Sequence, residues 1–202
     1  MKSNIIIQKE KNQVIKICRN SKEFKKELYI YQKKPYFAPQ LLDHNGTNTL
    51  MLEYIHGIPI IDLIQPDFSK LALLFSELHA LESNKGKRIC LKDSNPNNFI
   101  YCDINLKYYM LDFSEWEYDF PEADLIHFLL FWASIYPFER FELIFNQFKN
   151  AYRLSLPINP IEWEMQLPEV IHQFDSRRKK FGKHQDPLSD DIQINRDLLT
   201  EI

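Results

Sequence analysis

The sequence predicts an α+β fold in which a small, strand-rich N-terminal lobe precedes a mainly helical C-terminal lobe. Short β-like runs alternate with turn residues up to position 56, whereas apolar residues recur at helical spacing beyond Gly57. The chain has 202 residues, 45% of them hydrophobic, which is enough for one well-packed domain divided into two lobes. We therefore expect a single domain with lobes over residues 1–56 and 57–175 and a polar C-terminal tail over residues 176–202.

Four β-like runs and one helix are expected in the N-terminal lobe. The helix covers Ser21–Gln32, and Ser21 is its expected N-cap because a hydroxyl there can accept from a free backbone N–H. Polar residues separate the first two runs, and Asn45–Gly46 is the expected turn between the last two. The four runs are Ile5–Gln8, Val14–Cys18, Gln40–Asp43 and Thr49–Tyr54.

Helices and one pair of strands are expected in the C-terminal lobe. Apolar residues at helical spacing predict a helix over Phe68–Leu81, and Asn98–Cys102 and Tyr108–Phe113 read as short strands. Further helices are expected over residues 123–171, with breaks at three prolines, because proline removes a backbone donor and kinks or breaks a helix. The breaks are Pro137, Pro157 and Pro160. The stretch from Asp175 onward is polar, and we expect it to be loosely ordered.

Composition and charge exclude several kinds of protein. The formal net charge is -3, so nothing overall favours nucleic acid or an anionic membrane as a partner. The longest apolar stretch, Leu125–Phe138, is too short for a membrane span of about 20 residues and predicts a core helix. Cys18, Cys90 and Cys102 lie among apolar neighbours without paired spacing, so we expect buried thiols in a reducing, cytoplasmic compartment.

Lys16 is the first candidate for chemistry, because it lies in the middle of an apolar strand. Burying an ammonium group is costly unless an opposite charge accompanies it, and Glu27 on the following helix is a possible partner. The alternative is a lysine on the solvent face of a half-exposed strand, which simple alternation would also produce.

Asp93 and Asn98 are the second candidate, five positions apart in a proline-containing loop that leads into an apolar strand. Their oxygens could meet an acceptor hydroxyl and a metal ion at the rim of a cleft. The alternative is a turn rich in aspartate and asparagine, which this composition also favours.

Asp112 is the third candidate, a carboxylate at the end of the apolar run Tyr108–Leu111. Magnesium takes one or two carboxylates together with phosphate oxygens, so an acid at this position suits a metal–phosphate site. A strand-ending aspartate that caps the next turn is the alternative.

The three segments, in this order, resemble the protein-kinase-like superfamily from about Ile5 to Phe131. The similarity is to its compact branches: aminoglycoside and choline phosphotransferases, lipopolysaccharide-core kinases, and Bud32- and RIO-type kinases. The resemblance implies an ATP- and Mg²⁺-dependent kinase. In it, Asp93 is the catalytic aspartate, Lys16 the phosphate-binding lysine and Glu27 its partner. Asn98 and Asp112 are the metal ligands that the resemblance implies.

The resemblance also covers the hinge and the supporting helices. Backbone groups of Glu53 and Ile55 would face the adenine, and Asp124 looks like the structural aspartate of aminoglycoside-phosphotransferase-like chains. His79 and His127 lie in helical apolar patterns, and we interpret them as histidines at the edge of the core.

Departures from the family pattern leave a second function class open. None of the four glycines precedes Lys16, so the glycine-rich loop that covers the phosphates is not expected. Leu91 and Ser114 replace a histidine and a glycine that the family commonly has. The alternative function is therefore a catalytically inactive pseudokinase that acts as a binding or scaffolding module.

The residues do not single out one acceptor. The predicted partners are ATP and an unidentified hydroxyl-bearing acceptor, either a protein or a small molecule, and the short second lobe favours a macromolecule. Glu115–Glu117 could attract a cationic substrate, but a solvated turn is the preferred interpretation. The basic run Arg177–Lys180 with Lys183 is interpreted as a solvated tail, with binding of RNA, a phosphorylated partner or an acidic lipid surface as the alternatives.

Overall fold

The computed structural model describes residues 3–180 and 190–202. The chain divides into two compact units, each assembled from segments that are separate in the sequence. The first unit contains Met1–Pro66 and Pro96–Trp116, and the second contains Asp67–Asn95 and Glu117–Ile202. A lobe boundary between residues 56 and 57 stays a prediction.

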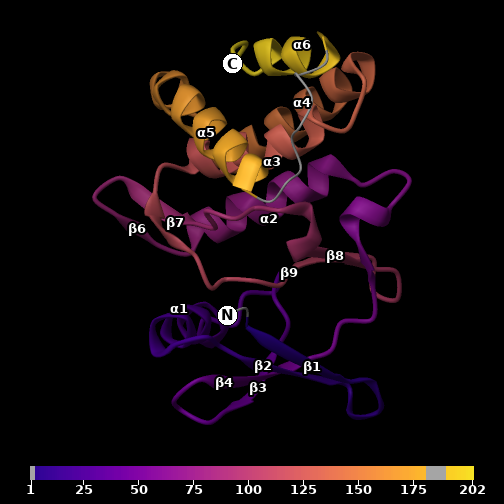
Figure 1. Cartoon of the computed structure of the whole chain (residues 1–202), viewed down its shortest axis with the longest axis vertical. Coiled ribbons are helices and arrows are strands. Elements are labelled where there is room, and N and C mark those ends of the chain that lie inside the picture. Colours follow the sequence, from indigo (N-terminus) through magenta and orange to yellow (C-terminus); the bar gives the residue numbers. More distant parts are fainter. Residues whose placement is uncertain (1–2, 181–189) are drawn as a thin grey trace. The chain divides into compact units, whose positions relative to one another are not determined.

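A four-stranded antiparallel sheet forms most of the first unit, with strand order β1-β2-β4-β3 (Figure 1). It consists of the two expected hairpins, and β2 at its centre pairs with β1 on one side and β4 on the other. A 3-10 turn, η1 (Lys9–Lys11), joins the first pair, and Asn12 closes it with a φ of 52°. The strands are β1 (Asn4–Gln8), β2 (Gln13–Ile17), β3 (Leu41–His44) and β4 (Thr49–Glu53).

Helix α1 (Ser21–Gln32) accompanies this sheet and confirms the predicted helix bounds. Its N-cap is Asn20 rather than the expected Ser21, because the Asn20 side chain accepts a hydrogen bond from the Glu23 backbone N–H. An asparagine oxygen caps as well as a serine hydroxyl, so composition could not choose between the two neighbours. The helix buries Phe24 and Ile30, and with them the carboxyl group of Glu27.

A second small sheet, of order β5-β8-β9, completes the first unit. It contains β5 (Ile58–Pro59), β8 (Phe99–Cys102) and β9 (Lys107–Met110), with 3-10 turns η2 (Ile60–Asp62) and η3 (Pro96–Asn98) nearby. Gly57 is required at its edge, because a Cβ atom there would lie 2.3 Å from Ile100 Cγ2 and 2.5 Å from the Tyr101 carbonyl oxygen. Sequence reasoning found the β8–β9 pair but missed β5, which is too short to leave a pattern.

The second unit is mainly helical, as predicted. Its aromatic core includes Trp132, Phe141, Phe145 and Phe148, all fully buried. The helices are α2 (Phe68–Ala80), α3 (Pro121–Ala133), α4 (Phe138–Arg153), α5 (Pro160–Lys180) and α6 (Asp190–Leu198). A short sheet of order β10-β7-β6 also belongs to this unit, with β6 (Ser83–Asn84), β7 (Lys87–Cys90) and β10 (Glu117–Asp119).

The expected loose tail from Asp175 is wrong for the described residues. Helix α5 continues to Lys180, and α6, yellow in Figure 1, packs against α3 and α4. The polar composition hid this packing because several of its polar side chains form hydrogen bonds within the second unit. Arg196 binds the Asp175 carboxylate through both Nη atoms, at 3.0 and 2.6 Å, and Asn195 donates to two backbone carbonyls. Lys183 of the basic cluster lies outside the described residues.

The three cysteines are buried and free, as expected. Among the described residues, none of the helices has the length and apolar character needed to cross a membrane.

Candidate functional site

The first unit contains a cavity of about 270 Å³ between the four-stranded sheet and the β8–β9 hairpin. Its apolar wall is suited to a flat, hydrophobic ring system. That wall is formed by Ile5, Ile7, Val14, Leu52, Ile100 and Leu111. Polar side chains of Lys16, Glu53, Asn98 and Asp112 also line it, so charged and apolar surfaces meet in one cavity.

Lys16 is the buried cation of this cavity. It is 5% exposed, and its alternation along β2 directs it to the same face as Val14. Its Nζ contacts Glu27 Oε1 and lies 3.0 Å from Asp112 Oδ1. The predicted Lys16–Glu27 pair is therefore present, and the alternative of a solvent-facing lysine is wrong.

The protonation of this triad follows from its burial and its charges. Burial would lower the pKa of Lys16, but Glu27 and Asp112 outweigh that effect and raise it. For Asp112, burial opposes ionisation, yet the Lys16 ammonium holds the pKa below its usual range. Burial raises the pKa of Glu27 to about 8 against the attraction of Lys16, because Glu27 is fully enclosed and a second carboxylate is close.

Backbone hydrogen bonds hold Asp112 at the cavity. The Leu111 N–H donates to the Asn98 carbonyl at 2.9 Å, next to the last pair of the β8–β9 ladder, Phe99 and Met110. The bond holds Asn98 beside the residue that precedes Asp112. The Phe113 N–H donates to Glu27 Oε1 at 3.2 Å, and the Ser114 N–H donates to Asp112 Oδ1 at 3.0 Å. Asp112 is thus more than a strand-ending cap, because the same oxygen accepts from Lys16 and from its own turn.

Glu53 and Ile55 also line the cavity, where the resemblance placed the adenine hinge. Glu53 ends β4, and its N–H donates to the Gln40 carbonyl at 2.9 Å. Ile55 is 7% exposed and packs with Cys102 and Tyr109 of the β8–β9 hairpin. These contacts attach the end of β4 to Gln40 and the segment after it to the β8–β9 hairpin.

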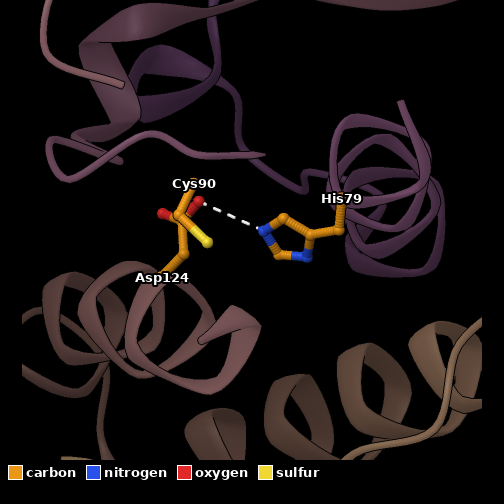
Figure 2. Close-up of side chains that lie close together, drawn as sticks. All are labelled: His79, Cys90 and Asp124. Carbon is orange, nitrogen blue, oxygen red and sulfur yellow. Dashed lines mark hydrogen bonds and ion pairs between the residues drawn. The ribbon is translucent and has the colours of Figure 1, made fainter. Parts of the chain in front are cut away.

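Asp93 belongs to the second unit, where hydrogen bonds hold the loop around it. Asp124, at the start of α3, accepts from the Leu91 N–H at 2.7 Å. His79 on α2 lies 3.3 Å from Asp124 Oδ2 through Nε2, and its Nδ1 lies 2.8 Å from the Tyr152 hydroxyl. Figure 2 shows His79 and Asp124 facing one another beside Cys90.

Arg177, on α5, is a neighbour of Asp93 that sequence reasoning missed. Its Nη1 donates to the Lys92 carbonyl at 3.1 Å and lies 3.9 Å from Asp93 Oδ1. Lys92 has a φ of 59°, a region that side chains other than glycine rarely adopt, and its Nζ lies 3.0 Å from Glu117 and 2.5 Å from Asp119. Arg177 is therefore part of a helix and not of a loose tail, although its side chain is exposed, as expected.

Solved structures resemble this chain over nearly its whole length. Choline kinase LicA from Streptococcus pneumoniae matches 99% of this chain and 88% of its own, with 13% identity and a TM-score of 0.62. A choline/ethanolamine kinase family protein from Mesorhizobium loti matches 100% and 83%, with 12% identity and a TM-score of 0.59. An aminoglycoside phosphotransferase from Streptomyces rimosus, solved with ADP and streptomycin, matches 98% and 92%, with 11% identity and a TM-score of 0.60.

The chain has the protein-kinase-like fold. The similarity confirms the fold that the motif order predicted. At identities of 11–13%, it establishes the fold and not the activity. No protein-family model matches the sequence. No curated protein matches it either.

Within the kinase-like fold, the predicted site residues divide between the two units. The first unit brings together Lys16, Glu27, Glu53, Ile55, Asn98 and Asp112. Asp93 lies in the second unit, with Asp124 and Arg177. Arg177 left no sequence signal because it is 85 positions from the carbonyl it contacts.

His79, Cys90 and Asp124 form a buried group whose ligand atoms lie close enough together to hold a metal ion (Figure 2). Hydrogen bonds of His79 with Asp124 and Tyr152, and of the Leu91 N–H with Asp124, favour a structural role for the group in joining α2, α3 and α4 to the loop after β7. Burial raises the pKa of the Cys90 thiol well above its usual value, and the Asp124 carboxylate adds to that rise, so the thiol stays protonated. His79 is fully buried between Asp124 and Tyr152, which corrects its interpretation as a histidine at the core edge.

Proposed function

We propose that this chain is an ATP- and Mg²⁺-dependent phosphotransferase that moves the γ-phosphate of ATP to a hydroxyl group. The observation that carries the proposal is the buried Lys16 held between Glu27 and Asp112 at one end of an apolar-walled cavity. Phosphoryl transfer requires a cation on the phosphates and a carboxylate that binds the metal. The apolar wall offers a surface on which the adenine can bind. The kinase-like fold supports the same assignment.

The cavity residues have separate roles in this proposal. The apolar wall and the segment at Glu53 and Ile55 bind the adenine, and Lys16 binds phosphate oxygens. The donors offered by Asn98 and Asp112 are oxygens, which fit magnesium because it prefers oxygen ligands. Bound magnesium would supply charge neutralisation on the phosphates. Glu27 keeps Lys16 pointed at the cavity.

Asp93 would orient the acceptor hydroxyl and receive its proton. Its loop is suited to this task because three elements hold it: α3 through Asp124, α5 through Arg177, and β10 through contacts with Lys92. A well-held carboxylate loses little entropy when the acceptor arrives, which favours transfer.

Two observations bear on the class of the acceptor. Sequence length favoured a macromolecular acceptor, whereas the similar structures are kinases of choline and ethanolamine and a phosphotransferase crystallised with streptomycin. We propose that small hydroxylated molecules are the first acceptors to test. Neither Glu115 nor Glu117 offers an unopposed negative charge to a cationic alcohol, because Arg19 lies 3.8 Å from Glu115 and Lys92 lies 3.0 Å from Glu117. Neutral and anionic alcohols therefore belong in the panel.

Calorimetric titration of ATP, with and without magnesium, tests the nucleotide site. Asp112→Asn should abolish Mg²⁺-dependent binding because it removes a metal ligand. Asp93→Asn should leave binding unchanged and lower transfer by about 10²–10⁴-fold, the usual contribution of a catalytic acid or base. Asp103→Asn, at an exposed position, is the matched control and should change neither quantity.

A scaffold function is the second candidate, and one feature favours it. The η1 turn that joins β1 to β2 contains Lys9–Lys11 and no glycine, so it cannot wrap phosphates as a glycine-rich loop does. Absence of ATP binding by the wild-type chain at millimolar nucleotide would support the scaffold and reject the phosphotransferase.

A further inference from the structure

Strand β1 is an outer strand of the four-stranded sheet and is unusually apolar for that position. It pairs with β2 on one side, while its other edge carries backbone N–H and C=O groups that no other strand of the described residues meets. Ile5, Ile6 and Ile7 are 59%, 47% and 54% exposed. An apolar open edge is a template for pairing with another strand.

The opposite edge of the same sheet shows how such pairing is normally discouraged. Strand β3 contains a charged residue, Asp43, and a register shift between Leu41 and Asp43. Both features obstruct the approach of another strand. Strand β1, with the sequence Asn4–Gln8, has no charge, no proline and no irregularity in its pairing with β2.

A bound nucleotide would account for only part of this apolar surface. Ile5 and Ile7 line the cavity, so a nucleotide there would cover them. Ile6 points to the other face of the sheet, where its cross-strand partner is Ile15 and the next residue in the row is Met51. Neither Ile6 nor the main-chain edge is covered by a ligand in the cavity.

The sequence of β1 indicates which strand would pair with it. Asn-Ile-Ile-Ile-Gln reads nearly the same in both directions about Ile6. Antiparallel pairing of two copies about that residue sets Asn4 against Gln8 and Ile5 against Ile7, so amide faces amide and apolar faces apolar. Ile6 faces Ile6 of the second copy at the two-fold axis.

We propose that β1 pairs antiparallel with β1 of a second copy of this chain, which joins the two four-stranded sheets into one continuous sheet. The contact is isologous, so it closes as a dimer and does not propagate into a fibre. Because a five-residue ribbon is smaller than a standard interface, the dimer is weak and its population depends on concentration.

Sedimentation equilibrium over a range of protein concentrations tests the assembly. The apparent mass should rise from the 24.3 kDa of one chain towards twice that value as concentration reaches about 0.1 mM. Ile6→Lys should abolish the rise, because two like charges would face each other at the axis. Leu42→Lys, at an equally exposed position on β3, is the control and should leave it intact.

Disulfide trapping tests the register. Directly opposed residues in an antiparallel pair have Cβ atoms about 4.5–5.5 Å apart, near the reach of a disulfide. Ile6→Cys should therefore form a covalent dimer under mild oxidation, whereas Leu42→Cys should not. The native cysteines are buried and should not interfere.

A mixture of Ile6→Lys and Ile6→Glu variants provides a charge-matched rescue. Each variant alone should be monomeric, and the mixture should form a heterodimer. Monomeric wild-type chain at every concentration, or equal trapping at positions 6 and 42, would overturn the proposal. None of these measurements requires nucleotide or acceptor, so their outcome is separate from that of the proposed phosphotransferase.

Discussion

Lys16 carries a charge into the interior because two carboxylates accompany it. The local sequence pointed to Glu27 as its partner, and the structure adds Asp112 from 96 positions away. One ammonium between two carboxylates leaves an excess negative charge, and burial directs the extra proton to Glu27. Lys16 therefore links the protonation of Glu27, on α1, to Asp112, the residue proposed to hold the metal.

Glu27 makes stability depend on pH. Its pKa rises from an ordinary 4.5 to about 8 in the folded chain, so the folded state holds a proton that the unfolded state releases. This contribution to stability is fully present below pH 4.5 and is lost as pH rises to about 8. The melting temperature should fall over this range by several degrees.

Replacing Glu27 with glutamine removes the titrating group but keeps an acceptor for Lys16. Thermal unfolding of Glu27→Gln, measured at intervals from pH 5 to 8, should show a flatter profile than the wild type. Glu10→Gln, at an exposed position, should retain the wild-type slope. A Glu27→Gln profile parallel to the wild type would show that this carboxyl group does not titrate in that interval.

At the scale of elements, three segments converge on the loop that carries Asp93. Asp124 at the start of α3 holds the Leu91 N–H, and Arg177 near the end of α5 holds the Lys92 carbonyl. Strand β10 supplies Glu117 and Asp119 to the Lys92 side chain. The unusual φ of Lys92 is maintained by these contacts, so α5 acts as part of the loop's support.

Arg177→Ala should lower phosphoryl transfer by about ten- to a hundredfold, because a small displacement of a catalytic group is costly. ATP affinity should be unchanged, since the cavity lies in the first unit. Steady-state kinetics and calorimetry together measure both quantities. Added guanidinium ion should restore part of the rate, which a merely misfolded variant would not show.

Lys179→Ala is the matched control for Arg177, because it removes an exposed cation from the same helical turn. It should leave transfer unchanged. Equal losses in the two variants would point to the overall charge of the helix end and would contradict a role for the Arg177–Lys92 contact.

At the scale of the whole molecule, polar contacts attach the last helix to the second unit. Asn195 donates to the carbonyls of Ala133 and Tyr136, at 2.9 and 2.8 Å, and Trp163 donates to the Leu199 carbonyl at 2.7 Å. Leu199 is fully buried. Helix α6 is therefore part of the core of this unit.

Asn195→Ala should lower the free energy of unfolding by about 2 kcal/mol, because two carbonyl groups lose their donor. Urea denaturation followed by circular dichroism measures the loss. Gln193→Ala, at an exposed position on the same helix, should change stability little. ATP affinity well below the unfolding transition should match the wild type in both variants; a weakened affinity in Asn195→Ala would show that α6 influences the first unit.

The sequence by itself determined the order of the first four strands, the bounds of α1 and the motif order that resembles kinases, and it named Glu27 as a possible partner of Lys16. These features are local, because strand alternation, helical spacing and turn residues each depend on residues only a few positions apart. Only the tertiary structure decided that Asp112 joins Lys16, that Arg177 supports the loop of Asp93, and that α6 belongs to the core. The first two contacts join residues 96 and 85 positions apart, and the contacts of Asn195 on α6 join residues 62 and 59 positions apart. Contacts over such separations leave no periodic pattern in the sequence, because burial and pairing of polar groups exist only once the chain has folded.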